Sequence, residues 1–172
     1  MAALLLPATA RVRESGRGTV CLGNLHQIGL ALQIYVQENS NHLPRMYDKS
    51  TTTLTNNNPS PDLVLSNQLG NLNVLKCPSD QWPSVQNRLV PTNGPTFFEQ
   101  TGSSYSWNFL LNGENADQLS ALGLKFDPHQ VPLMYDKEKF HSARGVGKEV
   151  NFLYADGHIK NLLAIEGTIQ RQ

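Results

Sequence analysis

The residues best suited to chemistry in this sequence are two carboxylates and two imidazoles in its last third. Such groups together can hold a divalent cation such as Zn²⁺ or Mn²⁺. The candidate ligands, if they converge at one end of a sheet, are Asp136, His141, Asp156 and His158. The alternative is that Asp156 serves a turn, while the histidines are exposed or hydrogen-bonded to the backbone. We favour this alternative and expect no cofactor.

Cys21 and Cys77 form a second pair of reactive side chains. An even pair suggests a disulfide in an exported protein, whereas in a cytosolic protein it suggests two buried thiols. The sequence has no C-x-x-C motif, so a thioredoxin-like redox role is not expected. It also has no G-x-S-x-G, H-E-x-x-H or Walker-type motif. We therefore expect a protein that is not an enzyme.

Aromatic residues make a third group. Trp82, Phe97 and Phe98 lie in segment 81–102, whose many Pro, Gly and Asn residues indicate an irregular excursion. Exposed there, they could contact a glycan or a protein partner. The aromatics of segment 103–109 alternate with polar residues, as in a half-buried strand, and are expected in the core.

Composition excludes several classes of protein. The chain has 172 residues, with 14 basic and 14 acidic side chains. A balanced charge argues against a nucleic-acid partner held by bulk electrostatics. The hydrophobic share of 39% is too high for general disorder, and no apolar run reaches the length of a membrane span. This length suits one domain with a core of its own.

A long helix is the first element expected to position these groups. Between residues 8 and 38, apolar residues recur every three or four positions. Leu30 and Ile34 widen this stripe, and segment 39–44, which ends in Pro44, stops the helix. Glycines within the helix each cost about 1 kcal/mol relative to alanine, so the helix depends on packing. The predicted core face comprises Leu22, Leu25, Ile28, Leu32 and Tyr35 or Val36.

Short strands follow the helix. We predict a short helix over 62–69 and strands over 72–76, 103–109, 131–135 and 150–154. Asp156-Gly157 then predicts a hairpin with a two-residue type I′ turn. The fold class is α+β, with the long helix across a small antiparallel sheet. We expect a single domain over 1–172, comprising the helix (1–38), a loop-rich segment (39–102) and the sheet with its hairpin (103–172).

Three motifs, in order, resemble a known family. They are residues 4–32, with Arg11, Arg13 and Glu14 before Cys21-Leu-Gly-Asn24-Leu25; Leu75-Lys76-Cys77-Pro78-Ser79-Asp80; and His141 with Asp156-Gly157-His158. Together they are similar to bacterial type IV pilins and type II secretion pseudopilins. The resemblance is closer to the prepilin-type proteins with an H-x9-DG domain. It implies a pilin-like fold and a disulfide between Cys21 and Cys77.

The resemblance also implies a function. The chain would be the globular part of a structural subunit in a pilus- or pseudopilus-like filament. Its partners would be other pilin-like subunits and, before assembly, the inner membrane, with a periplasmic or extracellular location. The residues expected to pack against neighbouring helices are Leu4, Leu5, Leu6, Pro7, Ala8 and Val12.

Two departures from the family pattern keep other functions open. The family begins with a prepilin leader and a hydrophobic start to the helix, and this sequence contains neither. Fourteen residues, not nine, separate His141 from Asp156. The alternatives are an exported surface or periplasmic module that binds a glycan or protein, and a divalent-metal-dependent enzyme.

Overall fold

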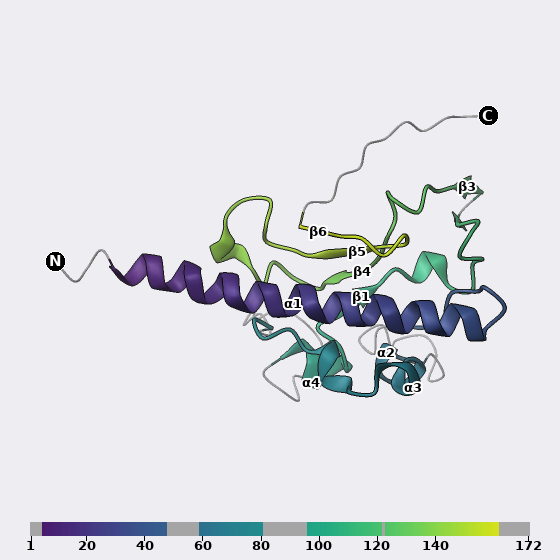
Figure 1. Cartoon of the computed structure of the whole chain (residues 1–172), viewed down its shortest axis with the longest axis horizontal. Coiled ribbons are helices and arrows are strands. Elements are labelled where there is room, and N and C mark those ends of the chain that lie inside the picture. The colour runs from purple at the N-terminus through teal and green to yellow at the C-terminus, as the bar shows by residue number, and fades with distance from the viewer. Residues whose placement is uncertain (1–4, 48–58, 81–95, 122, 162–172) are drawn as a thin grey trace, which may run out of the picture.

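The computed structural model describes residues 5–47, 59–80, 96–121 and 123–161. Its dominant element is α1 (Leu5–Glu38), a single helix of 34 residues that includes the helical pattern predicted between residues 8 and 38. Figure 1 shows α1 running between the sheet on one side and the short helices α2–α4 on the other. Buried side chains follow one helix face at the expected spacing: Cys21, Leu25, Ile28 and Leu32.

One part of the predicted helix face is wrong. Leu30 and Ile34 do not widen the core stripe, since they are 48% and 44% exposed. Successive residues turn by about 100° around a helix, which places both on the side opposite Ile28 and Leu32. The helix therefore has an apolar outer face as well as a core face.

The sheet is antiparallel and has four strands in the order β1-β4-β5-β6. These are β1 (Tyr105–Trp107), β4 (Pro132–Asp136), β5 (Phe152–Tyr154) and β6 (Ile159–Lys160). Two further strands, β2 (Ser120–Ala121) and β3 (Leu124–Lys125), pair separately. The α+β fold with one long helix and a small sheet is confirmed.

The short helices differ from expectation in two places. The predicted helix over 62–69 is present as α2 (Pro61–Val64) followed by α3 (Ser66–Leu69). The predicted strand over 72–76 is instead a 3₁₀ helix, η3 (Leu72–Leu75), because the Asn71 side chain accepts a hydrogen bond from the Asn73 N–H and starts a helical turn. The strand predicted over 103–109 is shorter, and Phe109 begins η4 (Phe109–Leu111) with 59% of its surface exposed.

The C-terminal hairpin is present, but its turn differs from the predicted type. The Gly157 N–H donates to the Tyr154 carbonyl at 2.9 Å, and the Tyr154 N–H donates to the His158 carbonyl at 2.9 Å. Gly157 has φ +88°, whereas Asp156 is not among the described residues with positive φ. The loop therefore spans residues 155–157 with glycine in the left-handed position, rather than two residues in a type I′ turn.

One core joins the three predicted segments of the chain. Leu25 and Ile28 of α1, Leu75 of η3, and Met134 and Leu153 of the sheet are all completely buried. The last two small helices, α4 (Phe97–Thr101) and η5 (Ser142–Arg144), complete the architecture. No helix within the described ranges combines the length and the apolar character that a bilayer crossing needs.

Candidate functional site

The disulfide implied by the resemblance is present. Cys21 of α1 is bonded to Cys77, which follows η3, with 5.3 Å between the two Cα atoms. Both residues are buried. The bond ties the middle of the long helix to the segment on the side opposite the sheet.

Asp136 and His141 lie beside this disulfide. His141 Nε2 is 3.6 Å from Cys77 Sγ and 3.6 Å from Asp136 Oδ2. The other ring nitrogen, Nδ1, donates to Glu14 Oε1 at 2.7 Å. Glu14 also accepts a hydrogen bond from Ser79 Oγ at 2.6 Å, so one carboxylate near the start of the helix holds two segments of the body.

Burial determines the charge state of this cluster. Burial raises the pKa of Asp136 to about 7, although its Oδ2 accepts hydrogen bonds from the backbone and side-chain N–H groups of Asn151. Asp136 Oδ1 has no hydrogen-bond partner within the described residues. Burial also lowers the pKa of His141 below its usual value, while Glu14 opposes that shift. The side chains of Asp136 and His141 are both fully buried.

The four predicted metal ligands do not form one site. Asp136 and His141 lie near the disulfide, whereas Asp156 and His158 gather with His129 in a second group. The register explains the separation. Tyr135 pairs with Phe152 and Pro132 with Tyr154, so Asp136 and Asp156 lie at opposite ends of the β4–β5 pair. The hypothesis that all four converge, which the sequence did not favour, is therefore wrong.

His129 is a member of the second group that the sequence analysis missed. The Ala155 N–H donates to the Val131 carbonyl at 3.0 Å, which places the residues before β4 beside the β5–β6 turn. A signal was available, because His129 precedes the predicted strand 131–135 by two residues. In an antiparallel pair, the start of one strand lies next to the end of its neighbour.

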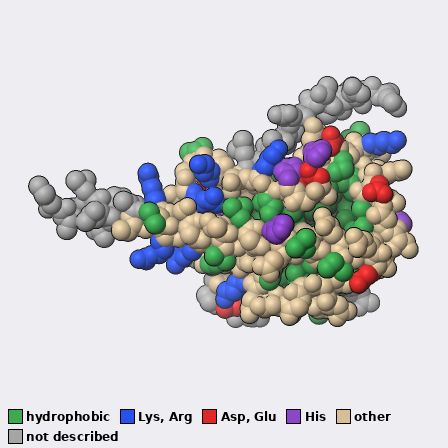
Figure 2. All heavy atoms as spheres, in the orientation of Figure 1, with side chains coloured by type: hydrophobic (Ala, Val, Ile, Leu, Met, Phe, Trp, Pro, Cys, Tyr) green, Lys and Arg blue, Asp and Glu red, His purple; other side chains and the backbone are tan. Residues whose placement is uncertain are grey.

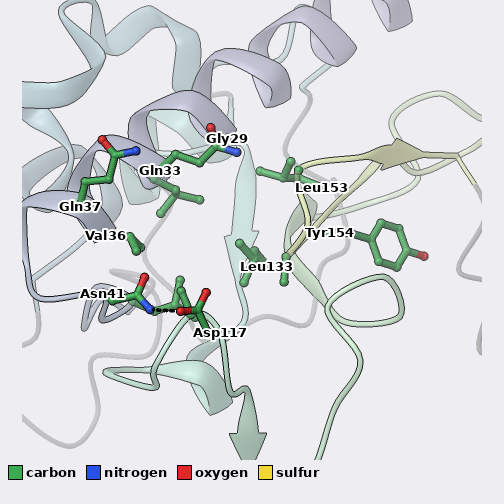
Figure 3. A pocket seen from close by; sticks show the side chains of 14 residues that line it. Gly29, Gln33, Val36, Gln37, Asn41, Asp117, Leu133, Leu153 and Tyr154 are labelled. Carbon is green, nitrogen blue, oxygen red and sulfur yellow. Dashed lines mark hydrogen bonds between the residues drawn. The ribbon is translucent and has the colours of Figure 1, made fainter.

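A groove runs between the second half of α1 and the turn after β5 (Figure 3). Its volume is about 250 Å³, and its walls combine apolar side chains such as Leu133 and Leu153 with the amides of Gln33 and Gln37. At its far end, Asn41 Nδ2 donates to Asp117 Oδ2 at 2.6 Å. Figure 3 shows the Tyr154 side chain pointing away from this groove.

The prediction of an exposed aromatic contact surface is wrong for Phe97, which is buried, and only partly met by Phe98, which is half-buried. Trp82 lies outside the described residues. Phe97 is only 5% exposed, and its ring packs against Phe140 with 5.8 Å between centroids. The Asp80 carboxylate accepts hydrogen bonds from the backbone N–H groups of Phe97 and Phe98. These bonds anchor the start of α4 to the body of the protein, and this is why Phe97 is buried. Phe98 is half-buried, with Lys76 Nζ 5.6 Å from its ring centroid.

All of the predicted filament-packing residues except Leu4 belong to the first turns of α1. Val12 is 73% exposed. Leu4 lies outside the described residues. Leu5, Leu6, Pro7 and Ala8 belong to α1, but their side chains lie outside the described part of the structure.

Comparisons of the chain with protein-family models, with curated proteins and with solved structures found no match.

Proposed function

We propose that this protein is the globular part of a pilin-like filament subunit and that α1 packs against other subunits. The observation that carries the proposal is a second stripe on α1, roughly opposite the core stripe. At about 100° per residue, its members fall within a sector of about 80°. Its apolar residues and glycines are all exposed: Val12, Gly16, Val20, Gly23, Leu30 and Ile34. Between Val12 and Ile34, one exposed polar residue, Gln27, lies in the same sector.

Two glycines of this outer stripe support a close helix neighbour. A Cβ added at Gly16 or at Gly23 would meet nothing within 4 Å, so the subunit's own packing does not require glycine there. Glycine in a helix interior nevertheless costs about 1 kcal/mol relative to alanine. Gly18 and Gly29 differ, because an added Cβ would lie 2.7 Å from Arg144 Nη1 and 3.2 Å from Leu153 Cδ1 respectively. Close approach by another subunit explains Gly16 and Gly23.

The start of α1 supports the same role. A helix of 34 residues is about 50 Å long, and Figure 1 shows its first turns projecting beyond the sheet. Residues 9–13 and 15–17 are exposed, and Figure 2 shows basic side chains gathered around this part of the helix. The turns that project beyond the sheet are too few to be stable as an isolated helix in water. A neighbouring subunit would therefore stabilise them. Acidic groups on that neighbour, or lipid phosphates, would complement the basic residues.

The proposal includes an exported location. A disulfide that closes a long loop persists in oxidising compartments and is rare in the cytosol. The proposed partners are therefore other pilin-like subunits in a periplasmic or extracellular filament, with the inner membrane as the site before assembly.

Site-specific photo-crosslinking tests the contact. A benzophenone side chain at Val20, on the outer stripe, is compared with one at Val146, which is 97% exposed and lies in a loop. We expect chain-to-chain adducts from position 20 that increase with protein concentration and decrease in a Gly23→Ala background. Equal adduct yields from positions 20 and 146, or no effect of Gly23→Ala, would refute the assignment of this face.

A further inference from the structure

Three side chains with metal-binding atoms converge on the surface beside the β5–β6 turn. Asp156 accepts contacts from both imidazoles: its Oδ2 meets His129 Nδ1, and its Oδ1 meets His158 Nδ1. One ligand atom from each residue lies within 4.8 Å of the others. Figure 2 shows histidine and acidic side chains gathered on the side of the molecule that carries this hairpin.

We propose that His129, Asp156 and His158 form a binding site for a divalent transition-metal cation. The site does not depend on the filament role proposed above. Imidazole suits Zn²⁺, Cu²⁺, Ni²⁺ and Fe²⁺, whereas Ca²⁺ and Mg²⁺ prefer cages made of oxygen ligands. Three protein ligands leave at least one coordination position open, as in catalytic zinc sites. Water or a carboxylate from another molecule would fill that position.

Two of the three ligands are held in place before any metal binds. The His158 ring stacks on the Tyr154 ring, with 4.3 Å between centroids and 9° between planes. The His158 backbone N–H donates to Asp156 Oδ1 at 3.1 Å, which fixes the carboxylate within its own turn. Tyr154 points away from the groove in Figure 3, and none of the three ligands is among the residues that line that groove.

Electrostatics favour an ionised carboxylate at this site. Partial burial raises the pKa of Asp156, but hydrogen bonds from the backbone and ring of His158 and from the ring of His129 outweigh it. The net result is a pKa below the usual value. Asp156 therefore brings a negative charge to the site. Lys160 is a cation near the β5–β6 turn, and its Nζ lies 5.8 Å from the Tyr154 ring centroid.

The buried group around the disulfide is a weaker candidate for a metal. It contains Cys21, Cys77, Asp136 and His141, but the two sulfur atoms are bonded to each other. Only a carboxylate and an imidazole then remain as ligands, and both are fully buried. The surface group needs no change of redox state and is open to solvent, because His129 is 72% exposed.

Zinc binding by the full chain, with its disulfide intact, tests the proposal. The protein is stripped with EDTA, dialysed without thiols, assayed for free thiols, and titrated with ZnCl₂ by calorimetry and equilibrium dialysis. We expect one equivalent of Zn²⁺ and at least a tenfold loss of affinity in His129→Ala. The loss of an outer-sphere partner alone typically costs 10–100-fold. The matched control is His26→Ala, which removes an exposed histidine of α1 and should leave binding unchanged.

A second variant protects the test against a folding defect. Asp156→Asn keeps an oxygen that can accept the His158 N–H, so the turn is retained while the charge is lost. We expect it to weaken Zn²⁺ binding at least tenfold, with an unchanged far-UV circular dichroism spectrum. The proposal is overturned if no stoichiometric Zn²⁺ binds. It is equally overturned if His129→Ala and Asp156→Asn stay within twofold of the parent, or if His26→Ala loses as much as they do.

Discussion

The buried carboxyl of Asp136 predicts an unusual dependence of stability on pH. Its pKa is about 7 in the folded protein, against 3.8 for an ordinary aspartate. Between these two values the folded chain holds a proton that the unfolded chain has lost. The free energy of unfolding therefore falls as pH rises from about 4 to about 7. Each pKa unit corresponds to about 1.4 kcal/mol, so the full penalty above pH 7 is on the order of 4 kcal/mol.

The neighbours of Asp136 affect the size of this penalty but not its sign. Asn151 donates two hydrogen bonds to Oδ2, and Arg144 is a nearby cation; both lower the pKa. Asp80 raises it, and burial is the largest cause of the shift. His141 has the opposite pH dependence, since its lowered pKa makes the folded state less stable as pH falls below the usual histidine range. The parent protein alone would show the sum of these effects.

Asp136→Asn isolates the carboxyl. Urea unfolding of the oxidised protein, from pH 4 to pH 8, gives the difference in unfolding free energy between variant and parent. We expect this difference to shift in favour of the variant by several kcal/mol as pH rises through the range. Val131→Ala is the control, because it removes buried methyl groups and no charge, so its effect should be the same at every pH. A pH-independent difference for Asp136→Asn would refute the reasoning.

Further predictions concern the disulfide and the helix glycines. Replacing Cys77 by serine opens a loop with a sequence separation of 56 and should lower the unfolding free energy by about 4 kcal/mol. The measurement is urea denaturation against the oxidised parent, and an unchanged unfolding free energy would mean that the disulfide does not stabilise the fold. Gly16→Ala should stabilise the subunit by about 1 kcal/mol, since nothing lies near its missing side chain. Gly18→Ala should raise the unfolding free energy by less in the same assay, because the Arg144 side chain must move away from the added methyl group. Equal increases for the two variants would contradict the close approach of Arg144 to Gly18.

Local patterns predicted the elements with strong periodicity. The spacing of Leu25, Ile28 and Leu32 predicted the long helix, and Asp156-Gly157 predicted the hairpin. The same periodicity could not decide whether Leu30 and Ile34 face the core, because an apolar residue on an outer helix face has the same hydropathy as one on an inner face. What decides it is which sides of the helix are covered, and that depends on tertiary contacts far away in the sequence.

The candidate sites were predicted less completely, for a related reason. His141 and Asp156 are closer in sequence than Glu14 and His141, yet only the second pair is in contact. Strand register separates the first pair, and the packing of α1 against the segment at η5 joins the second. His129 shows that part of this was available from the sequence, since predicted antiparallel strands also indicate which of their flanking residues lie close together. Glu14 has no comparable signal.

Glu14 and Cys21 hold α1 to the body of the molecule next to its first turns, where the proposed contact with other subunits lies. The helix leaves the body of the molecule near Glu14, whose carboxylate holds His141 and Ser79. Seven residues later, two turns along the same helix, Cys21 is covalently bonded to Cys77. A load on the projecting turns would therefore pass first to the two partly buried hydrogen bonds of Glu14 and then to a covalent bond. Reduction of the disulfide would leave the hydrogen bonds of one partly exposed carboxylate to anchor the helix where it emerges.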